Sequence, residues 1–306
     1  MTLNYKIQNE DLGVTIVSFL SRKYTYYSQV EWIKQVYEKK ILVNGLVITQ
    51  DYRIGAGDEI SFDLGEFTEP EVDSNYSIVY EDEYLFAVNK PGNLPVHPAG
   101  RYRNGNLTTL LSSSHPNFTF FIVNRIDRET SGLVLFGKTK LAASKLGKLF
   151  ETGKISKTYL CYVEGNFPEF ISANGYLGSD NTSTIRKKKK FTYDKMDSSL
   201  WNVNTDFKLL KYQNGISKLE VVPHTGKIHQ IRATLYSLGY PVVGDKIYGY
   251  DENLFLQFIQ NGIVENKYGI QRQALHAHCL DFIHPFMGKQ TIIRAEEPLD
   301  MENILF

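Results

Sequence analysis

The feature that most constrains the fold is a charged loop, residues 124–132, enclosed by two short apolar runs. The loop reads Asn-Arg-Ile-Asp-Arg-Glu-Thr-Ser-Gly and places Asp127 between two arginines. The flanking runs, 118–123 and 133–136, are rich in β-branched and aromatic residues, which predicts two buried strands. Strands of this kind fix both ends of a loop that stays open to solvent, as binding and catalytic loops require. From the spacing alone, an ordinary turn with a local hydrogen bond from Asp127 is the simpler interpretation.

Length and composition allow a sizeable core but give no whole-chain sign of a nucleic-acid partner. The chain has 306 residues, 42% of them hydrophobic, and a chain of that length is expected to fold as more than one domain. Its 34 basic and 34 acidic residues balance, so any RNA footprint must come from local clusters. Residues 1–10 lack the apolar core of a signal peptide, and no apolar run approaches the roughly 20 residues that span a bilayer. We expect a soluble, cytoplasmic protein without a membrane partner.

The first 64 residues predict a small separate module that begins with two helices. Asp11 or Thr15 can open the first helix. Ser28 can cap a second helix that runs to about residue 39, with Glu31 completing a capping box. Apolar residues at helical spacing in the second helix are Val30, Ile33 and Val36.

The strands of this module follow an Asn-Gly turn. Residues 41–47 alternate around Asn44-Gly45, which predicts a hairpin, and 59–62 predict another strand. Two helices and small strands of this kind resemble the alpha-L, or ribosomal-S-four-like, RNA-binding module; a helical cap of no particular function is the alternative. The basic residues that would serve RNA binding are Lys23, Lys34, Lys39 and Lys40. An acidic segment with Gly65 and Pro70 predicts a linker at 65–75, which leaves 76–306 as the second domain.

The second domain alternates predicted strands with two helices. Thr139 can cap a helix that ends near Gly153, and 157–163 alternate as a strand. Residues 205–210 and 218–222 predict paired strands, and the pieces at 272–277 and 282–285 are strand-like. A helix near 228–238 is indicated by the spacing of Ile228, Ile231, Leu235 and Leu238.

That helix carries an arginine among apolar residues. Helical spacing places His229, Arg232 and Tyr236 on one stripe beside the apolar face. An arginine in such a helix is rarely buried without an anionic partner, and Asp127 is a candidate for it. The ion pair would be either structural or part of a site.

Two further groups of polar residues allow more than one interpretation. The basic run 186–190 is either a solvated segment or an arm that contacts phosphates, whose binding would then fall with salt. Five histidines lack zinc-like spacing and are interpreted as core or loop residues, so no metal is expected: His224, His229, His276, His278 and His284. Cys161 and Cys279 lie far apart in strand-like contexts and are expected to be reduced.

Six motifs in order give the second domain a family resemblance. Residues 124–135 resemble the H-R-L-D-x-x-T-S-G-L-L-L motif of the RluA family of pseudouridine synthases. The others are Lys-Pro-Gly at 90–92, Lys-Thr-Tyr-Leu at 157–160, T-G-x-x-H-Q-I-R at 225–232, Gly-Asp and Tyr-Gly at 244–249, and R-Q-x-L-H-A at 272–277. The chain departs from the family pattern at Asn124 for His, Ile126 for Leu and Lys227 for Arg. The resemblance implies an α+β fold with a mixed, mostly antiparallel central sheet and flanking helices.

The same resemblance implies a reaction and the residues that perform it. Uridine in RNA would be converted to its C-glycoside isomer, pseudouridine, without cofactor or metal. Asp127 would be the catalytic carboxylate, acting on either the sugar or the base. Arg232 would keep Asp127 charged in a pocket where burial alone would raise its pKa. Tyr159 would stack on the target uracil and could help to move a proton.

Substrate contacts are implied as well. The target uridine must leave the RNA stack, and Arg125 is placed to fill the vacated space. Lys90 and His97 are expected at the pocket rim. Lys157 and Leu160, which flank Tyr159 in its motif, are also expected to contact the substrate.

Three questions of function stay open at the level of sequence. The RNA is expected to be large-subunit ribosomal RNA, with transfer RNA as the alternative and a monomer as the acting form. A catalytically silent RNA-binding protein with the same fold is a rival, for which the change to Asn124 and the neutral net charge are the hints. A glycosidase is a second rival, because Glu129 lies two residues from Asp127 and such enzymes use paired carboxylates.

Overall fold

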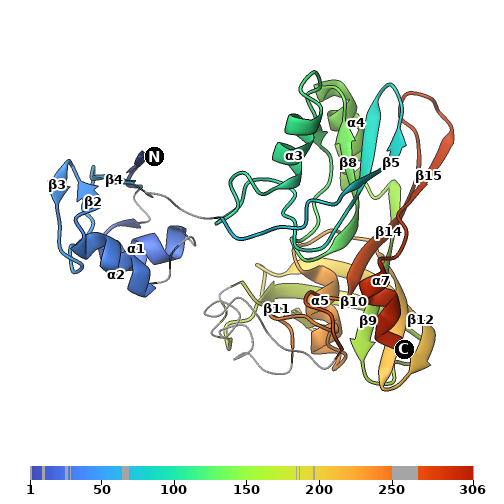
Figure 1. Cartoon of the computed structure of the whole chain (residues 1–306). Coiled ribbons are helices and arrows are strands. Elements are labelled where there is room, and N and C mark those ends of the chain that lie inside the picture. The colour runs from blue at the N-terminus through green and yellow to red at the C-terminus, as the bar shows by residue number, and fades with distance from the viewer. Residues whose placement is uncertain are drawn as a thin grey trace. The chain divides into compact units, whose positions relative to one another are not determined.

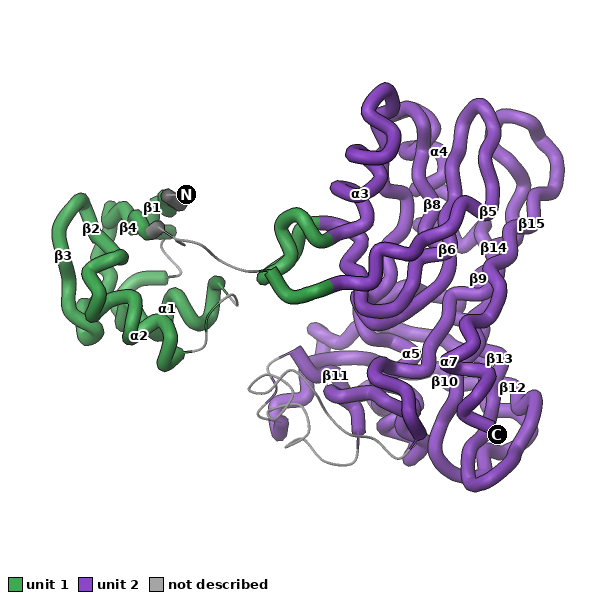
Figure 2. The backbone as a smooth tube through the Cα atoms, viewed as in Figure 1, with its two compact units in different colours: residues 1–71, 98–105 green, residues 72–97, 106–306 purple. Residues whose placement is uncertain are grey.

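The computed structural model describes two compact units, each treated by itself. The described residues are 2–8, 11–24, 27, 29–63, 69–183, 185, 187–195, 197–249 and 268–305. Contacts divide them into unit 1, residues 1–71 with 98–105, and unit 2, residues 72–97 with 106–306 (Figure 2).

Unit 1 packs two helices against a small antiparallel sheet. The helices are α1 (Ile16–Lys23) and α2 (Gln29–Tyr37), and the sheet order is β1 (Thr2–Lys6), β4 (Glu59–Asp63), β2 (Ile41–Val43) and β3 (Leu46–Val47). Thr15 caps α1, because its side chain accepts a hydrogen bond from the Ser18 amide. The Asn-Gly hairpin is confirmed: Asn44 and Gly45 both have positive φ, 52° and 76°, as a tight hairpin turn requires.

Two expectations for unit 1 are corrected. Val36 is buried on α2, but Val30 and Ile33 are exposed, because Trp32 is the residue that this helix inserts into the core. Strand β1 was not expected from the polar N-terminal sequence; its pairing with β4 forms it. The proposed cap at Ser28 lies outside the described residues.

Unit 2 is built on one large sheet, which confirms the expected α+β class (Figure 1). In the described chain its order is β11-β10-β12-β13-β9-β14-β8-β6-β5, with β15 beside β14 and β7 beside β8. The strands are β5 (Ser77–Glu81), β6 (Leu85–Lys90), β7 (Phe121–Ile122), β8 (Ser131–Gly137), β9 (Ile155–Glu164), β10 (Phe170–Ser179), β11 (Lys189–Thr192), β12 (Trp201–Gln213), β13 (Ile216–Pro223), β14 (Leu275–Ile283) and β15 (Gln290–Arg294).

Two of the helices described in unit 2 cover opposite faces of the sheet at β8. The described helices are α3 (Leu107–Ser114), α4 (Lys140–Glu151), α5 (Gln230–Ser237) and α7 (Leu299–Glu302), followed by the 3₁₀ turn Asn303–Leu305. The expected cap of α4 is present, since the Thr139 side chain accepts a hydrogen bond from the Ala142 amide. Leu133 and Leu135 share a core with Leu146 of α4, whereas Val134 and Phe136 share another with α3. Burial on both faces explains why β8 is a continuous apolar run in the sequence.

One parallel pairing interrupts the otherwise antiparallel sheet. Strand β14 runs parallel to β8, with Ala277 opposite Gly132. Gly132 has φ +107°, and a Cβ atom there would lie 2.3 Å from the Ala277 carbonyl oxygen, so only glycine fits. Because parallel strands begin at the same edge, the segments preceding β8 and β14 meet, and the loop at 124–130 is one of them.

Two boundaries in unit 2 differ from the expected ones. Of the apolar run 118–123, only Phe121–Ile122 forms a strand, and Phe118 is 52% exposed because it lies before the pairing with β8 begins. Ile228 is 54% exposed and precedes α5, which starts only after His229 turns the chain with φ 59°.

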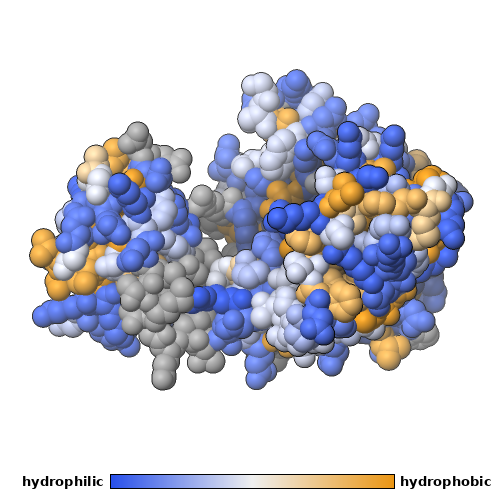
Figure 3. Space-filling view, turned by 90° about the horizontal axis from the view of Figure 1, so that it is seen from above, coloured by the Kyte–Doolittle hydropathy of each residue, from blue (hydrophilic) through white to orange (hydrophobic). Residues whose placement is uncertain are grey.

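No helix among the described residues is long and apolar enough to cross a membrane. On the face drawn in Figure 3, hydrophilic side chains predominate and hydrophobic ones form smaller patches.

Candidate active site

The segments that precede β8 and β14 build one side of the site. Gln273, two residues before β14, donates from Nε2 to Thr130 Oγ1 at 2.6 Å, and its Nε2 lies 3.5 Å from Asp127 Oδ2. Gln273 is almost completely buried. The sequence placed it in a motif without assigning it to the site; the parallel pairing of β8 and β14 is what brings it to Asp127.

Arg232 of α5 reaches the same carboxylate from the other side. Its NH1 donates to Asp127 Oδ2 at 2.8 Å. The Arg232 side chain is 5% exposed and the Asp127 side chain 33% exposed, so the pair has a buried end and a solvent-facing end. The two residues are 105 positions apart in the chain, and only the fold joins them.

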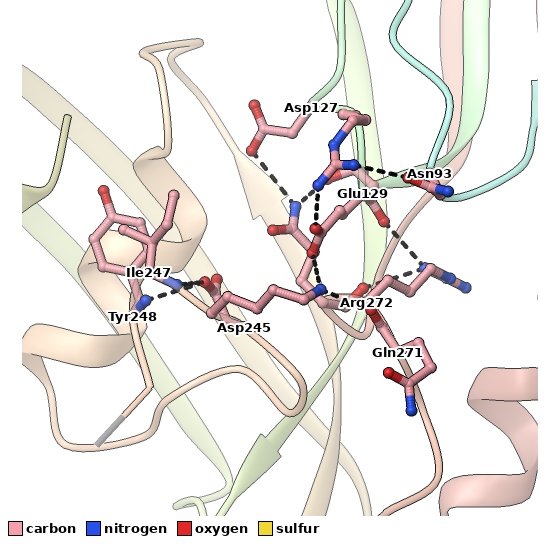
Figure 4. A network of polar contacts seen from close by, with 12 residues as sticks. Asn93, Asp127, Glu129, Asp245, Ile247, Tyr248, Gln271 and Arg272 are labelled. Carbon is pink, nitrogen blue, oxygen red and sulfur yellow. Dashed lines mark hydrogen bonds and ion pairs between the residues drawn. The ribbon is translucent and has the colours of Figure 1, made fainter. Parts of the chain in front are cut away.

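Asp245 is a second acid on Arg232, and sequence reasoning missed it. Arg232 Nε donates to Asp245 Oδ2 at 2.6 Å and its NH2 donates to Oδ1 at 2.8 Å. The amides of Ile247 and Tyr248 also donate to Oδ1, at 2.9 and 3.0 Å (Figure 4). The preceding Gly244 has φ +74° and approaches the Arg272 backbone too closely for a Cβ atom. In the sequence, the Gly244-Asp245 motif was therefore the feature that could have indicated this second acid.

Arg232 and Gln273 favour the ionised form of Asp127 against burial. Burial acts to raise the pKa of Asp127, the charge of Arg232 and the hydrogen bonds from Arg232 and Gln273 oppose it, and that pKa lies below its ordinary value. The pKa of Arg232 is in turn raised, because Asp245 and Asp127 overcome its desolvation. The arrangement presents a carboxylate that is charged, aimed and partly accessible.

Strand β9 carries three residues of the Lys-Thr-Tyr-Leu motif that were expected at the site: Lys157, Tyr159 and Leu160. Burial and the charge of Asp127 raise the pKa of Tyr159 to about 12, so its hydroxyl stays protonated near the carboxylate. Lys157 Nζ donates to the Thr225 carbonyl at 3.1 Å, and burial lowers its pKa. Leu160 is buried, 8% exposed. Of these three side chains, Tyr159 is the one whose pKa is raised by the charge of Asp127.

Lys90 does not lie at a pocket rim, so that expectation is wrong. Its side chain is completely buried, and Nζ donates to the carbonyls of Pro91 at 2.7 Å and Arg128 at 3.1 Å. It thereby ties the Lys-Pro-Gly segment to the loop that carries Asp127. His97 is half-buried, and its Nε2 lies 3.4 Å from Arg125 NH1.

Glu129 takes different partners from Asp127. It pairs with Arg128 at 2.6 Å and with Lys246 at 2.9 Å, and Arg128 donates onward to Asn93 at 2.8 Å (Figure 4). These ion pairs occupy both carboxylate oxygens of Glu129. A glycosidase needs two carboxylates that act on one bond, and Glu129 is instead committed to a structural network.

Asn124 holds the charged loop to β8. Its Oδ1 accepts from the Leu135 amide at 2.7 Å, and its Nδ2 donates to the Leu133 carbonyl at 3.3 Å. The Asn124 side chain thus makes hydrogen bonds to β8 that a paired strand would otherwise make. Asn124, which stands where the family usually has histidine, therefore has a structural role through both atoms of its amide.

The described part of the basic run is divided between buried and exposed lysines, so the solvated segment and the phosphate-contacting arm both stay predictions. Lys188 is 1% exposed with Nζ 4.2 Å from the centre of the Tyr236 ring, and Lys189 begins β11. The Lys189 amide donates to the Tyr248 hydroxyl at 2.9 Å. Lys187 and Lys190 are exposed, and desolvation together with the charges of Arg232 and Arg128 lowers the pKa of Lys187. Arg186 lies outside the described residues.

Histidines and cysteines show no metal arrangement in the described parts of the chain. No group of three or more His, Cys, Asp or Glu residues there could hold a metal ion. His276 is buried between Ser131 Oγ and the Ala295 carbonyl, and His224 pairs with Asp206 at 2.7 Å. Cys161 and Cys279 are both free thiols; Cys161 is buried and Cys279 is partly exposed.

Comparisons with known proteins identify the family. A sequence model of the family described as RNA pseudouridylate synthase matches residues 84–237. Ribosomal large subunit pseudouridine synthase D of Buchnera aphidicola (subsp. Schizaphis graminum) is 30% identical over 305 residues, 96% of this chain and 93% of that protein. The synthase D of Zymomonas mobilis is 33% identical over 239 residues, 74% of this chain and 70% of that protein.

A solved structure shares the fold. The human protein RNA Pseudouridylate Synthase Domain Containing 1 matches with a TM-score of 0.60 at 23% identity, covering 76% of this chain and 87% of that chain. The segment matched by the family model contains the loop of Asp127, strand β9 and the whole of helix α5. The chain therefore belongs to the RluA family of RNA pseudouridylate synthases, the isomerases that convert uridine in RNA to pseudouridine.

Proposed function

We propose that this chain isomerises specific uridines of large-subunit ribosomal RNA, with Asp127 as the catalytic carboxylate. The observation that carries the proposal is the Arg232–Asp127 pair, 2.8 Å long, inside the segment matched to the family. The relatives named above are called large-subunit pseudouridine synthases, which favours this RNA over transfer RNA.

The reaction needs an ionised carboxylate that keeps one of its oxygens accessible to the substrate. Arg232 and Gln273 approach Oδ2 of Asp127, and a third of the side chain stays exposed. Oδ1 is thus the oxygen presented to the substrate, on either the ribose or the uracil. The step breaks the N1–C1′ bond and forms the C5–C1′ bond, while C5 loses a proton to solvent and N1 gains one; no electrons enter or leave the base, so no redox cofactor is needed.

Tyr159 supports the base at the same place. A protonated phenol with a pKa near 12 offers a flat apolar ring for stacking and a hydroxyl that can pass a proton without ionising at neutral pH. Leu160 and Lys157 lie on the same strand as Tyr159. The ammonium group of Lys157 donates a hydrogen bond to the Thr225 carbonyl. We assign to these residues the support of the uracil and of the sugar-phosphate next to it.

Arg125 is assigned to the gap that the extruded uridine leaves. It lies two residues before Asp127 and contacts only the ring of His97, at 3.4 Å, among the hydrogen bonds of the described chain. A guanidinium plane can stack between bases, which offsets part of the cost of unstacking the target. The pKa of His97 is lowered by its own burial and by the charge of Arg125, so a neutral ring supports the arginine.

The module at residues 1–64 is proposed to add RNA affinity rather than chemistry. Of its four named lysines, Lys34 and Lys40 both pair with Glu38, at 3.8 and 2.5 Å. Lys23 contacts the Tyr5 ring and hydroxyl. These contacts are exposed, so RNA phosphates can displace them at small cost. The expected contribution is a salt-dependent part of binding.

The proposal is tested by comparing RNA substrates. Ribosomal RNA and transfer RNA labelled with tritium at carbon five of uridine are each given to the purified full chain, and tritium release is measured. Release from large-subunit RNA alone supports the proposal, and release from transfer RNA alone replaces it with the transfer RNA alternative. A protein that binds RNA but releases no tritium from either would be the catalytically silent homologue. Mapping the uridines that lose modification in a deletion strain then identifies the positions.

A further inference from the structure

A histidine next to Arg232 is held in one protonation state by a neighbouring tyrosine. His229 directly precedes α5, and its Nδ1 lies 2.9 Å from the Tyr248 hydroxyl. The two rings are perpendicular, with centroids 5.6 Å apart. His229 has φ 59°, an uncommon conformation for a residue with a side chain, so the backbone is bent to make this contact.

The direction of the hydrogen bonds follows from what each group can donate. The Lys189 amide can only donate, and it donates to the Tyr248 hydroxyl at 2.9 Å. The single hydroxyl proton of Tyr248 then has one described acceptor, Nδ1 of His229. With the hydroxyl proton directed to that nitrogen, Nδ1 is the acceptor, and His229 is a neutral imidazole with its proton on Nε2.

The surroundings of His229 favour the same neutral state. Burial and the charge of Arg232 lower its pKa to about 4, against the opposing charges of Asp127 and Asp245. Lys187 acts in the same direction as Arg232. Geometry places the ring near the carboxylate: Arg232, three residues further along the chain, binds Asp127 at 2.8 Å and lies 5.0 Å from the centre of the Tyr248 ring, whose hydroxyl contacts His229.

The edge of the ring that carries Nε2 is left for the substrate. His229 is only half-buried, and Nε2 makes no hydrogen bond with any residue that the structure describes. A donor that is fixed, neutral and next to the reacting carboxylate can bind a group that gains negative charge without giving up its proton.

We propose that His229, fixed as the Nε2-protonated tautomer by Tyr248, donates a hydrogen bond to a carbonyl oxygen of the target uracil. Negative charge builds on the uracil carbonyls whether Asp127 attacks the sugar, so that the base leaves with the bonding electrons, or adds to the base. The role is thus independent of that choice. It rests on the proposed site around Asp127 and adds a substrate contact to it.

The tautomer is tested first, in the unaltered full chain. With ¹⁵N-labelled histidine, two-bond ¹H–¹⁵N spectra distinguish the two neutral tautomers and the cation, and the His229→Gln spectrum assigns the signal. A non-protonated Nδ1 and a protonated Nε2 from pH 5 to pH 8 are expected. A protonated Nδ1 or a cation at pH 7 overturns the proposal.

The donor is tested by two amides of different reach. The Gln amide reaches the position of Nε2, whereas the Asn amide reaches only that of Nδ1, although Asn tolerates positive φ better. We expect His229→Ala to slow single-turnover tritium release about 100-fold with RNA affinity unchanged, and His229→Gln to recover at least about tenfold of that loss. His229→Asn should stay as slow as His229→Ala.

The controls separate this proposal from the function itself. His224→Ala removes an exposed histidine of the same segment and should leave the rate unchanged. An unchanged rate in His229→Ala, or a better recovery by Asn than by Gln, overturns the donor role. Neither result touches the assignment of Asp127, which fails only if Asp127→Ala retains activity.

Discussion

Arg232 is held by Asp245 through two parallel hydrogen bonds, 2.6 and 2.8 Å long, that leave only one of its nitrogens for Asp127. Asp245 is completely buried as a side chain. Paired in this way, the guanidinium is fixed before any substrate arrives. Asp127, the carboxylate that we propose acts in the reaction, is therefore positioned through Arg232 by a second acid, Asp245.

Asp245→Asn should destabilise the protein and reduce its rate together. The change leaves a buried guanidinium short of one compensating charge, and breaking a buried pair costs about 3 kcal/mol or more. Urea unfolding measures the loss of stability, and single-turnover tritium release measures the rate, which we expect to fall at least about 100-fold. Asp300→Asn is the matched control, because Asp300 forms the same two-bond pair with Arg272 but is 44% exposed. It should cost less than about 1 kcal/mol; equal losses in the two variants would contradict the assigned role of Asp245.

Arg232→Gln should move the acid limit of activity to higher pH. The pKa of Asp127 lies below its ordinary value in the folded protein, so its charge is present at neutral pH and is lost only as pH falls through that lowered pKa. Without Arg232, burial is less opposed and the pKa of Asp127 rises. The pH profile of the single-turnover rate between pH 4 and 8 measures the shift.

Arg128→Gln is the control for that profile. Arg128 is the next residue to Asp127 but pairs with Glu129 and Asn93. Its removal should leave the acid limit in place, whatever it does to the absolute rate. A profile that shifts equally in both variants would mean that general charge, and not the Arg232 contact, sets the pKa.

Gly132→Ala should disrupt the junction of β8 with β14. The new Cβ atom would lie 2.3 Å from the Ala277 carbonyl oxygen at a residue with φ +107°. Overpacking and backbone strain together predict a loss of about 3 kcal/mol or more in the free energy of unfolding. Gly147→Ala, the same substitution in the middle of α4 with nothing near the added atom, should instead stabilise by up to about 1 kcal/mol. Two losses of similar size would rule out the steric explanation.

Asn124→Asp should destabilise the protein in a pH-dependent way. The carboxylate keeps the acceptor for the Leu135 amide but sets an oxygen without a proton against the Leu133 carbonyl. A loss of about 2 kcal/mol is expected at pH 7. Protonation restores a donor, so the difference from the wild type should shrink as the pH falls below about 5. A difference that does not change with pH would show that the bond to Leu133 contributes nothing.

The sequence predicted the elements that local pattern determines. The Asn44-Gly45 turn, the caps at Thr15 and Thr139 and the doubly buried run of β8 all follow from residues within a few positions of one another. The importance of Asp127 came from the ordered family motifs and not from spacing, which favoured a plain turn.

The parts that sequence reasoning missed depend on pairings between distant segments. Gln273 reaches Asp127 because β14 runs parallel to β8, and Asp245 meets Arg232 across thirteen residues and a glycine turn. Lys90 resembled a surface residue in the sequence, but in the fold it is buried and donates to the carbonyls of Pro91 and Arg128. Charge alone could not distinguish a buried lysine from an exposed one.

The most direct measurement is tritium release by Asp127→Asn and Asp127→Ala in the full chain, with RNA affinity measured in parallel. Both variants should lose detectable release from large-subunit ribosomal RNA labelled at carbon five of uridine, while still binding that RNA and unfolding at nearly the wild-type denaturant concentration. Release at the wild-type rate by either folded variant would contradict the account.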